Sequence, residues 1–153
     1  DFPDYGRDVD SFLIADSGYD VYPAAWSGKP DVIDAQADCL TQLVPAMQQS
    51  QIDYMNDPVA VNQALSDYLV EINQFFQITP ELAAEVHRVL GDEGLVTDGT
   101  DGPFGSFDAE RTPRMTDVPL EIYAATDIAT ADGLTADDIY TNEFLDPSIS
   151  FGQ

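Results

Sequence analysis

The sequence predicts a mostly α-helical chain with one or two short strands. Several segments place apolar residues three and four positions apart, as on one buried helix face, and each begins at a residue suited to cap a helix. Only one apolar run, Ser11–Ala15, has the length and composition of a buried strand. The 153 residues suffice for a single domain over 1–153, and the 44% apolar content argues against a disordered chain.

Residues 1–17 are predicted to form an extended entry followed by a strand. Pro3 and Gly6 interrupt the entry, and the strand Ser11–Ala15 ends at the turn-forming sequence Asp16-Ser17-Gly18. A single strand cannot satisfy its own backbone N–H and C=O groups. We therefore expect it either to pair with a second copy of the chain, as a strand-paired homodimer, or to complete a sheet of a larger protein.

The segment Gly18–Pro30 (GYDVYPAAWSGKP) is predicted to be an aromatic loop. It places Tyr19, Tyr22 and Trp26 close together in sequence. Such rings can stack on a ligand, and they can equally anchor the loop to a neighbouring helix, so both interpretations stay open.

Helical segments are predicted from residue 31 onward, through the middle of the chain. Asp31 is typical of an N-cap, and the helix after it is expected to kink or divide at Pro45 and to run on to Met55. Asp57-Pro58 and Thr79-Pro80 each place a capping residue before a proline whose missing N–H is harmless in a first turn. The side chains expected to be buried are Val61, Leu65, Tyr68, Leu69, Ile72, Phe75, Phe76, Val86, Val89 and Leu90.

The last third of the chain, Gly94–Ile149, is dense in turns and caps. Residues from Asp98 onward resemble a calcium-binding loop, but Pro103 and Ala109 stand where that loop needs glycine and glutamate. A turn-rich loop without a metal ion is therefore expected.

Two further helical segments are predicted after this loop, and the second of them is short. Asp108 is expected to cap the first, which Pro119 should bend or split, and its apolar face comprises Met115, Val118, Ile122 and Tyr123. Thr135 and Asp138 have the spacing of a capping box at the start of the second. Phe144, Leu145 and Ile149 are expected to dock on the core.

The charge of the chain excludes some partners. Twenty-nine acidic residues face five basic ones, for a formal net charge of −24. Nucleic acid would be repelled and would find too few basic residues to displace its counterions. Anionic membrane surfaces are disfavoured for the same reason. Such acidity is typical of a halophilic protein or of an acidic secretome.

The sequence offers no catalytic constellation. Cys39 is the single cysteine and is expected to be a buried, inert thiol, and His87 is the single histidine and is expected to be structural or solvated. One histidine excludes an all-histidine zinc site, and no nucleophile–base pair or phosphate-binding glycine loop accompanies the carboxylates. We therefore expect no enzyme activity, no catalytic residue, no metal and no cofactor.

The order of several segments resembles one protein family. SFLIAD is followed by ITPELAAEVHRVLGDEGLV, DGPFGSFDAER and LTADDIYTNEFLDPSI. This order is similar to the C-terminal portion of substrate-binding proteins of ABC transporters, in the branch that includes nitrate, sulfonate, taurine and thiamine-precursor binding. The resemblance implies the C-terminal part of a two-lobe α/β fold, with residues 1–17 as a strand returning into the first lobe and 31–153 as its helical wrap.

The resemblance also implies a function and partners. It implies an extracytoplasmic solute receptor, present as a C-terminal fragment, that delivers a nitrate-, sulfonate-, taurine- or pyrimidine-like molecule to permease subunits. No signal segment is recognisable at Asp1, so we expect any such segment, with its lipid anchor, outside this sequence. Tyr5 and Asp16 are expected near the ligand cleft, and Tyr22 or Trp26 could cover it. The alternative is a stand-alone acidic helical interaction domain, for which amphipathic helices and a charged surface suffice.

Overall fold

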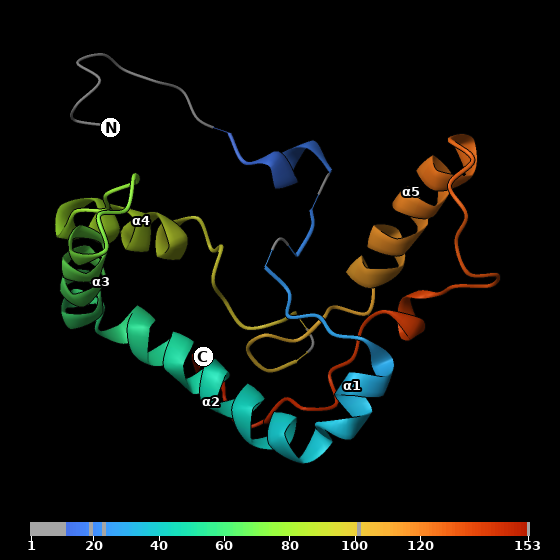
Figure 1. The fold of residues 1–153 in the computed structure, drawn as a ribbon, viewed down its shortest axis with the longest axis horizontal. Coiled ribbons are helices and arrows are strands. Elements are labelled where there is room, and N and C mark those ends of the chain that lie inside the picture. The colour runs from blue at the N-terminus through green and yellow to red at the C-terminus, as the bar shows by residue number, and fades with distance from the viewer. Residues whose placement is uncertain (1–11, 19, 23, 101, 153) are drawn as a thin grey trace. The chain divides into compact units, whose positions relative to one another are not determined.

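The computed structural model of the chain describes residues 12–18, 20–22, 24–100 and 102–152 (Figure 1). Helices account for 54% of the structure, which confirms the predicted mostly α class. Tyr5, one of the predicted ligand residues, lies outside the described residues.

The chain divides into two compact units, each described here by itself. Unit 1 comprises Asp1–Gly28 and Ala109–Tyr140. Unit 2 comprises Lys29–Asp108 and Thr141–Gln153. Each unit therefore joins segments that are distant in sequence.

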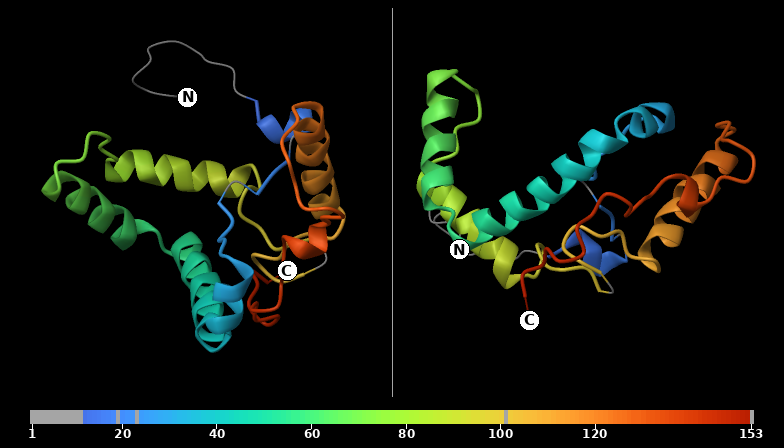
Figure 2. Two further views of the ribbon diagram at one scale, coloured as in Figure 1. Left: turned by 45° about the vertical axis from the view of Figure 1, so that its right-hand side comes forward. Right: turned by 90° about the horizontal axis from the view of Figure 1, so that it is seen from below.

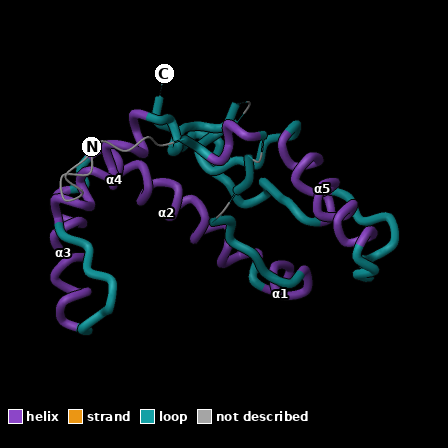
Figure 3. Tube along the Cα trace, turned by 90° about the horizontal axis from the view of Figure 1, so that it is seen from above, coloured by secondary structure: helices purple, strands orange, loops and turns teal. Residues whose placement is uncertain are grey.

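The strand predicted over Ser11–Ala15 is wrong in its described part. Ile14–Ser17 forms a short 3₁₀ helix, η1, in which Ser17 Oγ donates to Ile14 O at 2.6 Å. Such local side-chain bonds compete with extended pairing, and Gly18 closes the turn at a φ of 89°. The described residues contain one isolated bridge, Asp98 with Phe104, and no sheet (Figure 3). The expected strand-paired homodimer needs a strand in this segment, and residues 12–17 do not form one.

Unit 2 begins with two consecutive helices, α1 (Pro30–Ala35) and α2 (Ala37–Asn56). Lys29, not Asp31, occupies the N-cap of α1, because Pro30 suits the first helical position. Of the kink or division predicted at Pro45, the division is wrong, since α2 continues through Pro45 as one helix. The chain breaks instead at Gln36, between α1 and α2.

The next two helices of unit 2, α3 (Val59–Glu71) and α4 (Pro80–Asp92), are in contact (Figure 2). The predicted start of α4 is confirmed: Thr79 Oγ1 accepts a hydrogen bond from Leu82 N at 3.2 Å. For α3, Pro58 takes the N-cap position, so the predicted Asp57 cap is wrong by one residue.

A polar junction joins α2, α3 and α4. His87 Nε2 lies 3.0 Å from the carbonyl oxygen of Met55, and the His87 ring meets Tyr54 edge-on with ring centroids 5.5 Å apart. Tyr54 donates its hydroxyl to Asn62 Oδ1 at 3.1 Å, and Asn62 is buried. These contacts agree with the structural role predicted for His87.

The predicted apolar core is largely exposed in the described residues. Only Ile52 and Ala83 are buried apolar residues there. The exposed residues among those predicted to be buried or to form an apolar helix face are Val61, Leu65, Tyr68, Ile72, Phe75, Phe76, Val86, Val118, Ile122, Tyr123 and Cys39. Periodicity correctly indicated amphipathic helices, but it could not indicate whether this chain supplies the surface that covers them.

The C-terminal segment of unit 2 is held by side-chain amides. Gln48, in the middle of α2, is 3% exposed and hydrogen-bonds the backbone of Phe104 and Asp146. Asn142 bonds the backbone of Phe107 in both directions. The predicted docking of Phe144, Leu145 and Ile149 agrees with their half-buried state.

Unit 1 contains α5 (Arg111–Ala125) and the short 3₁₀ helix η2 (Ala136–Asp138), which contacts α5. Glu110 rather than Asp108 precedes α5, and Pro119 does not split it. The predicted capping box is confirmed, because Thr135 N donates to Asp138 Oδ2 at 2.8 Å.

Candidate functional site

The two arginines at the start of α5 form a basic pair with Asp20. Arg111 and Arg114 lie one helical turn apart, so their side chains share one side of the helix. Arg111 Nε lies 3.1 Å from Asp20 Oδ1, and Arg114 reaches Asp20 Oδ2 at 3.6 Å. Both guanidinium groups therefore hold one carboxylate.

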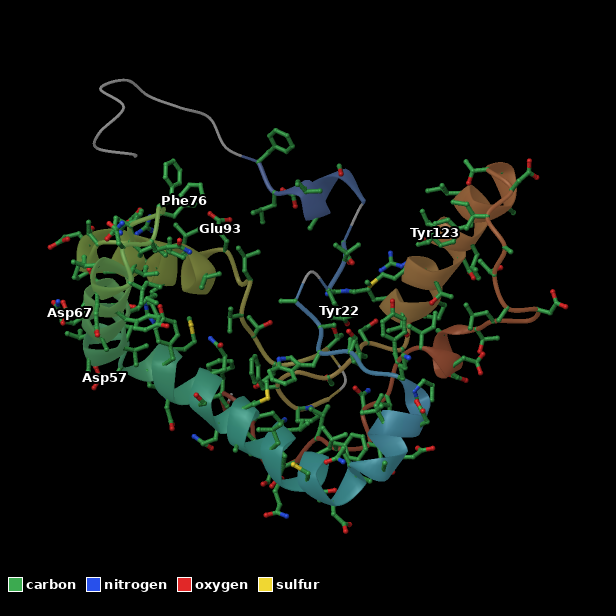
Figure 4. The ribbon with its side chains drawn as sticks, viewed as in Figure 1. Tyr22, Asp57, Asp67, Phe76, Glu93 and Tyr123 are labelled. Carbon is green, nitrogen blue, oxygen red and sulfur yellow. The ribbon has the colours of Figure 1, made fainter. Side chains whose placement is uncertain are left out.

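Tyr22, labelled in Figure 4, completes this cluster. The guanidinium carbon of Arg111 lies 4.7 Å from the centre of the Tyr22 ring, the geometry of a cation–π contact. The side chains of Asp20 and Arg111 are 30% and 35% exposed, whereas that of Arg114 is 69% exposed. The Asp20–Arg111 pair is thus partly shielded, and the Arg114 contact, in water, contributes little to stability.

This cluster concentrates positive charge in a chain that has little. The sequence holds five basic residues against 29 acids, and two of the five are Arg111 and Arg114. A pair of guanidinium groups can bind a carboxylate, sulfonate or phosphate through several charge-assisted hydrogen bonds. In this structure the carboxylate of Asp20 occupies that position.

The predicted ligand residues that the structure describes differ in burial and in their contacts. Tyr22 lies against Arg111 and is half-buried. Asp16 is exposed on η1, and Trp26 is exposed on the loop that precedes α1. Of the predicted set, Tyr22 is therefore the residue that the described contacts connect to a charged cluster.

Sequence reasoning missed Asp20, Arg111 and Arg114 as a group. About ninety positions separate Asp20 from the arginines, and no local pattern brings them together. One signal was present in the sequence: two arginines with i, i+3 spacing are conspicuous in a chain with five basic residues.

A second feature, in unit 2, is an open depression of about 780 Å³ beside the end of α2. Six of its eight lining residues carry polar side-chain groups, two of them carboxylates, and an open depression of this kind does not enclose a small molecule. The lining residues are Ala46, Gln49, Ser50, Gln51, Asp53, Tyr54, Asp57 and Val61.

Among the described residues, histidine, cysteine and carboxylate side chains form no group of three or more that could hold a metal ion. Among the residues that the structure describes, none of the helices combines the length and the apolar character of a membrane span. Comparison of the chain with protein-family models, curated proteins and solved structures gives no match.

Proposed function

We propose that this chain is the helical C-terminal part of a solute-binding protein of an ABC importer. In this proposal the protein binds a small molecule outside the cytoplasm and delivers it to permease subunits, without catalysis. The observation that carries the proposal is the set of uncovered apolar helix faces. Helices that wrap a sheet need an apolar face toward it, and the resemblance implies that the sheets lie in other parts of such a receptor.

Helix α5 provides the clearest case of such a face. Val118 and Ile122 lie four residues apart on α5, and both are exposed, as is Tyr123 next to Ile122. The residues that α5 does bury, Thr112 and Thr116, are polar, and Thr116 donates its hydroxyl to Thr112 O at 2.9 Å. Burying each large apolar side chain contributes about 1.5–3 kcal/mol, so this face gains stability when other protein surface covers it.

The basic pair supports an anionic solute rather than a neutral one. Nitrate and sulfonates present oxygen atoms that guanidinium groups bind well. A solute at this position would replace the carboxylate of Asp20 between Arg111 and Arg114. Tyr22 would then form one wall of the site beneath Arg111.

The proposal is tested with the product of the complete gene. Calorimetric titration with taurine, methanesulfonate, nitrate and hydroxymethylpyrimidine should give saturable binding of at least one of the first three. Arg111→Gln with Arg114→Gln should then weaken that binding at least about tenfold, as expected for loss of charge-assisted bonds. Arg88→Gln, a basic residue of unit 2, is the matched control.

Two results contradict this proposal. If none of the four solutes binds to a cooperatively folded product, the receptor function is wrong. If a sulfonate binds equally well to the double variant, the receptor function stands and the basic pair is excluded as its site.

A stand-alone acidic helical interaction domain is the second candidate, favoured by the same uncovered faces. The two proposals differ in the behaviour of the 153-residue chain alone. A receptor part separated from its sheets should bind hydrophobic dyes and unfold without a sharp transition. An interaction domain should unfold cooperatively as a monomer, which calorimetry and sedimentation measure.

A further inference from the structure

The loop between α3 and α4 presents two phenylalanines to solvent. Phe75 and Phe76 are 88% and 75% exposed, and their rings meet edge-to-face with centroids 5.1 Å apart. Figure 4 shows Phe76 pointing away from the helices. These two adjacent aromatic side chains, in contact with each other and largely exposed, form a small apolar surface at the tip of the loop.

The backbone of this loop, residues 72–79, is held by specific bonds. Asn73 adopts a φ of 51°, in the left-handed region that asparagine tolerates better than most residues. Gln77 Nε2 donates to the carbonyl oxygens of Leu69 and Gln74, and Gln74 Oε1 accepts from Phe75 N at 3.0 Å. Thr79 caps α4, so hydrogen bonds hold both ends of the loop. The two rings therefore project from a turn whose backbone is held in place.

The charge around the tip has one sign. Between Val59 and Val86 every charged side chain is acidic, and these residues are Asp67, Glu71, Glu81 and Glu85. Arg88, the next basic residue along the chain, is paired with Glu85 and Asp92 on α4. Its hydrogen bond to Glu85 lowers the pKa of that carboxyl group.

We propose that this loop, the Phe75–Phe76 tip, is a docking element for a protein surface with an apolar groove rimmed by lysine or arginine. Aromatic side chains supply most of the energy at the centre of interfaces, and complementary charges at the rim speed association and select the partner. A second copy of this chain is disfavoured because acidic flanks would meet acidic flanks. An anionic lipid surface is disfavoured for the same reason.

The test measures binding of labelled peptides to the chain. The peptides present the chemistry expected of the partner, apolar side chains beside lysines. One peptide is an amphipathic helix of leucine and lysine, and a lysine–serine peptide of equal charge and a leucine–glutamate helix are the comparisons. Fluorescence anisotropy should show binding of the leucine–lysine peptide at least about tenfold tighter than of the other two. The affinity should fall as salt is raised, because the rim contacts are screened.

Variants then locate the binding surface. Phe75→Ser with Phe76→Ser should weaken binding at least about tenfold, and Glu71→Gln with Glu81→Gln should weaken it and reduce its salt dependence. Val59→Ser with Ile128→Ser removes two other exposed apolar side chains and should leave the affinity unchanged. Circular dichroism of each variant checks that the helices are retained.

Several results overturn the proposal. Equal binding of the lysine–serine peptide would show a purely electrostatic contact, and unchanged affinity of the double phenylalanine variant would show that the tip takes no part in binding. Binding to phosphatidylcholine vesicles that depends on the two phenylalanines would make a membrane the occupant. Self-association abolished by the same variant, measured by sedimentation, would make it a second copy of the chain.

Discussion

The side-chain amide of Gln48 pairs with the backbone of Asp146 in both directions. Gln48 Oε1 accepts from Asp146 N at 2.8 Å, while Gln48 Nε2 donates to Asp146 O at 3.4 Å and to Phe104 O at 2.7 Å. A single buried side chain thus fixes both the loop that contains Phe104 and the C-terminal segment to α2. Because these groups are partly or fully buried, removing the amide leaves backbone donors and acceptors unsatisfied.

Replacing Gln48 by alanine should release the C-terminal segment from α2. We expect a loss of about 1–3 kcal/mol in the free energy of unfolding, and faster hydrogen exchange at Asp146 N. Gln49→Ala is the matched control, because Gln49 is exposed and bonds only Asp53 of its own helix among the contacts described. Equal stability of the two variants would contradict the role given to Gln48.

Asn142→Asp separates the two bonds that Asn142 makes to Phe107. The side chain accepts from Phe107 N at 2.8 Å and donates to Phe107 O at 2.9 Å, and a carboxylate keeps only the first. We expect Phe107 N to stay protected from hydrogen exchange in Asn142→Asp and to lose protection in Asn142→Ala. Loss of protection in both variants would indicate that the bonds act together rather than separately.

The η2 cap should loosen at acid pH. The hydroxyl and the N–H of Thr135 both donate to Asp138 and lower the pKa of its carboxyl group. Because the folded pKa lies below the unfolded value of about 3.9, this contribution is present above that pH and is lost as the pH falls through the folded pKa. Amide shifts of Thr135 measured from neutral to acid pH should show the change.

Asp138→Asn should remove most of this pH response at Thr135, because an amide does not titrate in this range. Asp137→Asn, at the next position, keeps the Asp138 carboxylate and should preserve the response. If Asp138→Asn still shows the acid transition, another group is responsible for it.

His87→Phe should keep the edge-on ring contact with Tyr54 but remove the bond to Met55 O. We expect a decrease of about 0.5–1.5 kcal/mol in the free energy of unfolding, as for one hydrogen bond. His87→Ala removes both contacts and should cost more. Urea unfolding at neutral pH measures these differences in stability. Equal stability of the wild type and His87→Phe would show that His87 stabilises the protein through its ring contact with Tyr54 and not through its bond to Met55.

Helix starts were predictable where their chemistry is local. Thr79 before Pro80, and Thr135 with Asp138, carry their hydrogen-bond partners within three residues, so the sequence pattern is sufficient. Whether the segment around Ser11–Ala15 forms a strand could not be predicted in this way, because a strand depends on a neighbouring strand from another segment. Without one in the described residues, Ser17 and Gly18 close Ile14–Ser17 into a local turn.

The candidate site depended on contacts that no local pattern encodes. Asp20 meets Arg111 only because residues 1–28 and 109–140 fold into one unit. Tyr22 was selected as a candidate from its aromatic loop, but its guanidinium partner, Arg111, could not be predicted from that loop. The ligand role of Tyr22, Asp16, Trp26 and Tyr5 stays a prediction.

The helical class, the amphipathic faces and several caps follow from the sequence, because they depend on residue spacing and on neighbours within a turn, and the acidity follows from composition. Which faces are covered and which polar groups are buried depends instead on how distant segments pack. Gln48, Asn62 and Thr116 are buried, whereas Phe75 and Phe76 are exposed. Burial depends on the surface that other segments supply, and hydrophobicity alone does not specify that surface.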